Sequence, residues 1–264
     1  MKNSKEINVA QKLIRCKSVA PNIDSALKVV ETECKSIGFK STKLRFSEKG
    51  FDTINNLYAE IGNGKPHFSF AGHVDVVPAN KKDWATDPFA GIIKNNNLIG
   101  RGAVDMKSAI ACFLSATKSY LEENKNFKGK ISMLITGDEE TYAVNGTKKI
   151  LKWLKKKRIK VDACLVGEPT NLKNLGDSMR IGRRGGFNGI VEVQGKAGHS
   201  AWPNRTINPV SGLMQMLTNI NKKVLDKGTK HFQPSIIQIT SIDVGNEALN
   251  VIPAKATGCF NIRF

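Results

Sequence analysis

Acidic residues and one histidine stand at the ends of apolar segments, at spacings suited to a metal ion. His73 follows an apolar run and lies two residues before Asp75 in the stretch GHVDVVP. Alternation along a strand puts both side chains on one side, where the carboxylate can fix the tautomer of a metal-bound imidazole. A His-x-Asp pair alone is common and usually structural, so a metal site requires further ligands.

Three further places in the sequence supply acidic candidates. Asp105 stands at the mouth of a helical pattern, where the ordinary role of an aspartate is to cap the helix. Glu139 and Glu140 follow Asp138 directly after an apolar run, and Glu168 follows another. A single acidic cluster of this kind is usually a solvated loop. Each place therefore has a structural interpretation of its own.

Taken together, the four places favour one metal site. Each lies where a strand of an α/β sheet would pass into its loop, and open sheets bind ligands at that edge. One site explains all four more economically than four separate structural roles. Histidine and carboxylates without a thiolate suit Zn²⁺ or Co²⁺ in a catalytic centre, and a shared carboxylate can hold two ions.

The elements that must position these residues alternate between short apolar runs and helical patterns. We expect strands at 56–61, 67–77, 130–136 and 161–166, a hairpin within 84–100, and helices within 1–19 and at 105–121 and 146–156. Strand–helix–strand order with short links predicts an α/β fold with a mixed, largely parallel sheet and flanking helices.

The pattern changes after about residue 176. A strand is expected at 187–194, a helix at 208–225, and strands at 233–242 and 254–264. This order predicts a smaller α+β domain. We place the first domain at 1–180 and the second at 181–264.

Composition excludes several classes of protein. The net charge is +18, but its densest run is Lys152–Lys160, and with aromatic residues at 7% no base-stacking surface accompanies it, so we expect no nucleic-acid partner. No apolar run approaches the roughly 20 residues that span a bilayer. The five cysteines are scattered without a C-x-x-C pair, which indicates reduced thiols in a cytoplasmic protein.

The motifs, taken in order, resemble those of a known family. GHVDVVP, WATDPF, GRGAVDMK, GDEE, GEPT, IGRRGG and GHSAWP occur as in the two-zinc amidohydrolases, which include acetylornithine deacetylase, aminoacylases and glutamate carboxypeptidases. Each motif is weak alone, and the combination, which covers essentially the whole chain, is specific. The resemblance implies a zinc-peptidase-like catalytic domain, a smaller dimerisation domain and two Zn²⁺ per complete subunit, with Co²⁺ as an alternative.

The resemblance also implies roles for individual residues. His73, Asp105 and Glu168 match the ligands of one zinc, with Asp105 bridging to a second zinc that Glu140 binds. Glu139 matches the general base, which takes a proton from the attacking water and passes it to the leaving amine. Asp75 matches the partner that orients His73. In the second domain His199 matches a histidine that reaches the active site of the neighbouring subunit of a homodimer and stabilises the oxyanion.

Substrate recognition is implied by a second set of motifs. IGRRGG, RGAVDM, GHSAWP and NVIP resemble those of the desuccinylases of this family. The matching arginine, Arg183 or Arg184, would bind a substrate carboxylate, and Asn250 would contact substrate across the dimer. The implied reaction is zinc-dependent hydrolysis of the succinyl amide of a small anionic substrate, N-succinyl-LL-2,6-diaminopimelate, in lysine and cell-wall precursor synthesis.

Two other interpretations stay open. Within the family, the chain could hydrolyse N-acetylornithine or other acylamino acids. From a different class, it could be a non-catalytic zinc-binding or dimerisation module. Gly186 stands where the family usually has serine, and Ser108 where it has glycine. The family also continues beyond the position of Phe264 to a last histidine ligand, so the resemblance implies that both domains are incomplete and that the 264-residue chain is inactive.

Overall fold

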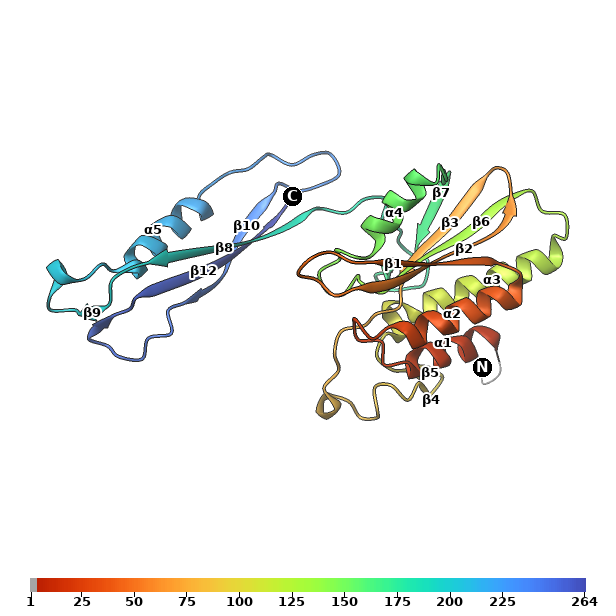
Figure 1. Cartoon of the computed structure of the whole chain (residues 1–264), viewed down its shortest axis with the longest axis horizontal. Coiled ribbons are helices and arrows are strands. Elements are labelled where there is room, and N and C mark those ends of the chain that lie inside the picture. Colours follow the sequence, from red (N-terminus) through yellow and green to blue (C-terminus); the bar gives the residue numbers. More distant parts are fainter. Residues whose placement is uncertain (1–3) are drawn as a thin grey trace. The chain divides into compact units, whose positions relative to one another are not determined.

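The computed structural model describes residues 4–264, which form two compact units (Figure 1). The first unit ends at Leu175 and the second runs from Gly176 to Phe264. Within residues 4–264, no helix combines the length and the apolar character that a membrane crossing requires. The candidate ligands at His73, Asp105, Glu139, Glu140 and Glu168 all belong to the first unit.

The first unit is built on a five-stranded sheet of order β1-β2-β6-β3-β7. The strands are β1 (Lys40–Phe46), β2 (Ile54–Asn63), β3 (His67–His73), β6 (Gly129–Thr136) and β7 (Ala163–Val166). β6, β3 and β7 are mutually parallel, while β2 is antiparallel to both β6 and β1. Four of the five strands therefore run in one direction, which confirms the expected mixed, largely parallel sheet.

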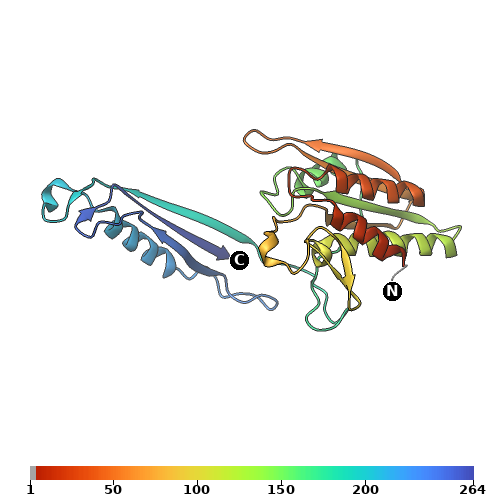
Figure 2. The ribbon, with the colours of Figure 1, turned by 90° about the horizontal axis from the view of Figure 1, so that it is seen from below.

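Helices cover both faces of this sheet. The helices are α1 (Lys5–Arg15), α2 (Asp24–Ile37), α3 (Ser108–Glu123) and α4 (Thr147–Lys156). Figures 1 and 2 show α1, α2 and α3 on one face and α4 on the other. Successive side chains of a strand point to opposite faces of the sheet, so each face has its own hydrophobic core. Leu57 and Met133 pack toward α1, α2 and α3, and the next residues along each strand, Tyr58 and Leu134, pack toward α4.

The segments that carry the candidate ligands differ in detail from expectation. The strand expected to reach residue 77 ends at His73, so Asp75 lies in a loop. The helix expected from residue 105 begins at Ser108, after a separate irregular turn, η2 (Ala103–Lys107). The residue at the N-cap position of α3 is Lys107, and no side chain caps the helix, so Asp105 does not cap α3. Its carboxylate is therefore available for another role.

The remaining elements of the first unit include one confirmed hairpin and three elements that carried no prediction. β4 (Ile92–Lys94) pairs with β5 (Asn97–Ile99). Asn95 and Asn96 between them have φ of 49° and 60°, as the tight turn of a two-residue hairpin requires. A short helix, η1 (Lys81–Asp83), precedes this hairpin. α2 and β1 were not predicted from the sequence.

The second unit is a small α+β fold. β8 (Gly186–Gln194), β10 (Ile236–Asp243) and β12 (Lys255–Arg263) form an antiparallel sheet of order β10-β12-β8. α5 (Pro209–Asn221) packs Leu213 and Leu217 against Ala256 of this sheet. At one end β9 (Gly198–His199) pairs with β11 (Val251–Ile252), next to η3 (Pro203–Arg205). The longer elements β8, α5, β10 and β12 confirm the expected strand–helix–strand–strand order, whereas β9, η3 and β11 carried no prediction.

Two adjacent residues of α4 test the core on that face of the sheet. Ile150 is fully buried, whereas Leu151 is 53% exposed. We expect Ile150→Ala to lower the free energy of unfolding by about 2–5 kcal/mol, because it removes buried contacts with Tyr58 and Leu134. Leu151→Ala on the same helix should change it by about 0.5 kcal/mol or less. Urea unfolding followed by circular dichroism measures both, and equal losses would contradict the assigned face of α4.

Candidate metal centre

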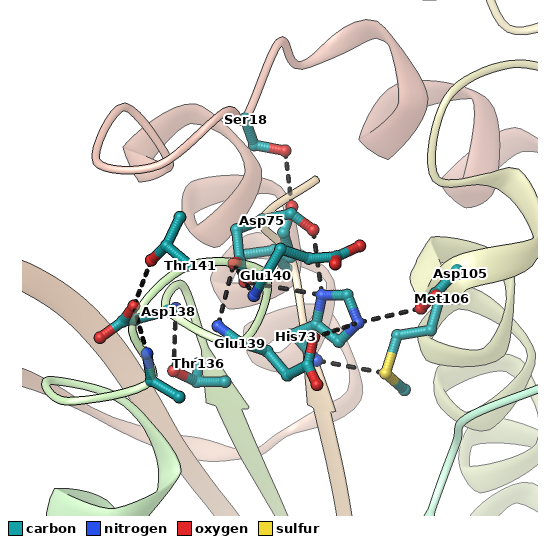
Figure 3. A network of polar contacts seen from close by, with 12 residues as sticks. Ser18, His73, Asp75, Asp105, Met106, Thr136, Asp138, Glu139, Glu140 and Thr141 are labelled. Carbon is teal, nitrogen blue, oxygen red and sulfur yellow. Dashed lines mark hydrogen bonds and ion pairs between the residues drawn. The ribbon is translucent and has the colours of Figure 1, made fainter. Parts of the chain in front are cut away.

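His73 is placed at the end of β3 with one ring nitrogen held by the protein (Figure 3). The residue is 1% exposed. Its Nδ1 lies 3.0 Å from the main-chain oxygen of Asp75, so the Nδ1 proton is donated to that carbonyl. When the ring is neutral, this tautomer leaves Nε2 unprotonated, which is the form that binds a metal ion.

Carboxylates converge on His73 Nε2. The nearest oxygen is Asp105 Oδ1 at 3.0 Å, followed by Glu168 Oε1 at 3.5 Å and Glu139 Oε2 at 3.8 Å. Glu168 is the more buried of these side chains at 15% exposure. Asp105 comes from η2, Glu139 from the loop after β6, and Glu168 from the loop after β7. The predicted edge of the sheet therefore does bring these side chains together.

The donors form two groups that share His73. In the first group, a nitrogen of His73 and one oxygen each of Asp105 and Glu168 lie within 4.8 Å of one another. In the second group, the same holds for a nitrogen of His73 and one oxygen each of Glu139 and Glu140. Both groups contain one imidazole and two carboxylates. Such a donor set suits Zn²⁺ or Co²⁺ and lacks the thiolates typical of structural zinc.

Asp75 joins the ends of two strands through its buried carboxylate. Oδ2 accepts hydrogen bonds from the main-chain N–H of Glu139 at 2.9 Å and of Glu140 at 2.8 Å. Its Oδ1 lies 3.5 Å from His73 Nδ1, farther than the main-chain oxygen. The sequence pattern predicted that the carboxylate would fix the imidazole. In the structure the main-chain carbonyl is the closer partner of the ring, and the carboxylate contacts both the ring and the glutamate loop.

A second aspartate folds this glutamate loop, and no role was predicted for it. Asp138 is 4% exposed. Its carboxylate accepts hydrogen bonds from the Thr141 hydroxyl and from the main-chain N–H of Ala143 and Asn145. These bonds close residues 138–145 into a loop that presents the two glutamates on one side. A hydroxyl three residues after an acidic residue is the local signal that could have indicated this role.

Electrostatics in the cluster favour a cation. Burial alone would lower the pKa of His73, but the hydrogen bonds and charge of Asp75, together with Glu139, raise it to about 9. Burial raises the pKa of Glu140, and the charges of Asp105 and Glu139 raise it further. Carboxylates held this close repel one another, and a divalent ion removes that repulsion. The residues present therefore fit a divalent metal ion.

His199 and Asn250 lie side by side in the second unit. β9 pairs with β11 there, and the Ser200 N–H donates to the main-chain oxygen of Asn250 at 2.9 Å. His199 Nδ1 accepts from the Ala201 N–H at 3.1 Å, so the proton of the neutral ring is on Nε2. Asn250 Nδ2 is 3.5 Å from that nitrogen. Both side chains are exposed.

The two adjacent arginines of the second unit differ in their surroundings. Arg184 Nη2 donates to the main-chain oxygens of Pro234 at 3.0 Å and of Arg263 at 2.6 Å. It therefore ties the start of β8 to the end of β12. Arg183 is exposed. The geometry favours Arg183 over Arg184 as the arginine available to a ligand.

The other two histidines, His67 and His231, belong to neither donor group. His67 is buried at the opposite end of β3, where its ring contacts the Lys160 main-chain oxygen at 2.7 Å and the Ser132 hydroxyl at 2.8 Å. His231 is exposed in the second unit, between α5 and β10.

The fold and the donor set define a metal-binding hydrolase of the α/β class, and comparison with known proteins agrees. Residues 69–252 match the model of peptidase family M20/M25/M40. The chain belongs to this family.

Two relatives of known name are similar along most of the chain. The chain is 49% identical over 259 residues to a succinyl-diaminopimelate desuccinylase of Parvibaculum lavamentivorans, and the aligned region covers 98% of this chain and 65% of that protein. It is also 49% identical over 260 residues to the enzyme of that name from Pelagibacter ubique, with 98% and 68% covered. The chain thus spans about two thirds of the length of these relatives.

Solved structures share the fold at low sequence identity. The di-peptidase Dug1p of Saccharomyces cerevisiae superposes with a TM-score of 0.71 and 18% identity over 98% of this chain and 69% of its own. A Bacillus subtilis protein described as a dinuclear metal-binding peptidase of the M20 family superposes with a TM-score of 0.59 and 14% identity, over 98% and 63%. These likenesses confirm the fold.

The bond between Asp75 and the glutamate loop generates a prediction. Asp75→Asn keeps the size of the side chain but removes the charge that accepts two N–H donors. We expect the affinity for Zn²⁺ to fall by about 10–100-fold, as is usual when a group that orients metal ligands is changed. Asp162→Asn is a matched control, because Asp162 accepts the His67 N–H at the opposite end of β3. Zinc titration calorimetry measures both, and an equal loss in the two variants would contradict the role of Asp75.

Proposed function

We propose that this chain carries the metal centre of an amidase that hydrolyses N-succinyl-LL-2,6-diaminopimelate to succinate and LL-2,6-diaminopimelate. The observation that carries the proposal is the convergence of carboxylates on His73 Nε2 in a chain 49% identical to proteins named for this reaction. The relatives are longer than this chain, so the activity is proposed for the protein to which it corresponds.

Two divalent ions, Zn²⁺ or Co²⁺, fit the proposed centre. His73, Asp105 and Glu168 would hold one ion, and Glu140 the other, with the Asp105 carboxylate shared. When bound, such ions polarise an amide carbonyl and lower the pKa of a water molecule. The two donor groups that share His73 support a site of this size.

Glu139 is proposed as the general base. Its main-chain N–H donates a hydrogen bond to Asp75, which fixes the backbone of Glu139. Its side chain is 47% exposed, so the carboxylate is accessible to substrate. It would take a proton from the attacking water and deliver it to the leaving amine nitrogen. The same group then serves as base and as acid within one turnover.

His199 is proposed to act across a homodimer formed through the second unit. Its Nε2 carries the ring proton and the side chain is exposed, so it can donate a hydrogen bond to the negative charge that develops on the amide oxygen. Asn250 beside it is proposed as a substrate contact. Arg183 is proposed to bind a carboxylate of the succinyl substrate through its planar guanidinium.

A related acyl substrate is the alternative that a direct assay separates. The chain should be assayed alone and after fusion to the part of the Parvibaculum lavamentivorans relative that it does not match. N-succinyl-LL-2,6-diaminopimelate and N-acetylornithine are supplied side by side with Zn²⁺. Preferential release of succinate supports the proposal. Preferential release of acetate would favour a deacetylase, and zinc binding without turnover in either form would favour a non-catalytic module.

Substitution of the two adjacent glutamates separates proton transfer from metal binding. In whichever form of the protein is active, we expect Glu139→Gln to lower kcat by about 10²–10⁴-fold, because a general base is lost. Its zinc content should stay near that of the parent. Glu140→Gln, the matched variant, should lose zinc together with activity. Loss of zinc from Glu139→Gln would show that Glu139 is a ligand.

Substitution of the two adjacent arginines tests substrate recognition. Arg183→Ala should raise KM for the succinyl substrate by roughly 10–100-fold, since a hydrogen bond to a charged group contributes about 1.5–3 kcal/mol. Its melting temperature should be unchanged. Arg184→Ala should instead lower the melting temperature, because the Pro234 and Arg263 carbonyls lose their donor. A KM effect confined to Arg184→Ala would reverse the assignment.

A further inference from the structure

The end of α1 is joined to the loop that carries Asp105 by a buried lysine. Lys107 has no exposed surface. Its Nζ donates to the main-chain oxygens of Leu13 and Cys16, each at 2.9 Å. Carbonyls at the C-terminus of a helix have lost all or part of their intrahelical partners, and a cation is favourable there. Lys107 therefore caps α1 from a distant part of the sequence.

The same lysine closes the Asp105 loop upon itself. Its main-chain N–H donates to the Gly102 oxygen at 2.9 Å, which closes residues 102–107 into a loop. Gly102 has φ of 80°, and a Cβ there would lie 2.8 Å from a Val76 methyl and 3.0 Å from the Lys107 stem. The Asp105 loop is thereby packed against the loop that follows His73.

The segment just after α1 holds that second loop. Ser18 is fully buried, and its hydroxyl donates to the Val74 main-chain oxygen at 2.5 Å. The Val76 N–H donates in turn to the Ser18 oxygen at 2.9 Å. These two bonds flank Asp75, whose carbonyl orients His73. Residues 13–18 thus contact both ligand-bearing loops, one through Lys107 and the other through Ser18.

We infer that residues 13–18 form a common platform that sets the spacing between His73 and Asp105, and that Lys107 and Ser18 are positioning residues for the metal centre. The inference rests on the proposed metal centre. The two ligand atoms lie 3.0 Å apart although their residues are 32 positions apart in the chain. Loss of either link frees one loop to shift, and a metal ion then binds a less well-formed donor set.

Cobalt binding by the 264-residue chain tests the inference. Co²⁺ is titrated into the metal-free parent, Lys107→Met, Ser18→Ala and Lys130→Met, with the visible d–d absorption as readout and melting temperature in parallel. Lys130 is the matched control, because its ammonium is also bound in the first unit, to Glu60 at 2.7 Å, but at the opposite end of the sheet. We expect Co²⁺ affinity to fall by about 10–100-fold in Lys107→Met, with an altered spectrum. Ser18→Ala should fall by about 2–10-fold, as expected for one lost hydrogen bond.

The outcomes separate positioning from bulk stability. Lys130→Met should bind Co²⁺ as the parent does, even if its melting temperature falls. Lys107→Met with a lowered melting temperature but parental Co²⁺ affinity and spectrum would overturn the inference. Should Lys107→Met fail to fold by circular dichroism, Ser18→Ala becomes the deciding variant, and unchanged Co²⁺ affinity there overturns the inference. A parent chain that binds no Co²⁺ would refute the metal centre itself, and the platform with it.

Discussion

One buried carboxylate, that of Asp75, connects the two strand ends on which the site depends. The side chain is removed from water, and a buried carboxylate is stable only with donors or cations around it. Asp75 finds them in the Glu139 and Glu140 amides, while its own carbonyl holds the imidazole of His73. The histidine at the end of β3 and the glutamates after β6 are therefore aligned by one residue between them.

This alignment concentrates negative charge in a small volume. The oxygens of Asp105, Glu139 and Glu168 all lie within 4 Å of one ring nitrogen. Mutual repulsion would spread them apart unless the loops were held from behind or a cation drew them together. The structure provides the first of these through Lys107 and Ser18, buried behind the loops. An imidazole and several carboxylates are also suitable ligands for a divalent cation, which would draw the oxygens together.

The second unit has a small core and leaves two polar side chains at its surface. A three-stranded antiparallel sheet and one helix are enough to bury Leu213, Leu217 and Ala256, and they leave the β9–β11 pair to present His199 and Asn250. Arg184 closes the start of β8 onto the end of β12. This small fold keeps two polar side chains exposed and next to each other.

The sequence by itself indicated the candidate ligands, the strand ends that carry His73, the glutamate pair and Glu168, and most of the strands and helices, because hydrophobic alternation and strand-end polarity are local properties. It did not reveal α2 or β1, nor that Asp105 would lie in η2, before the start of α3. Only the tertiary structure decided which atoms meet. The bond from Lys107 to Leu13 joins residues 94 apart, and that from Ser18 to Val74 joins residues 56 apart. Main-chain carbonyls accept both bonds, and every residue has such a carbonyl, so no residue type in the sequence marks the partner.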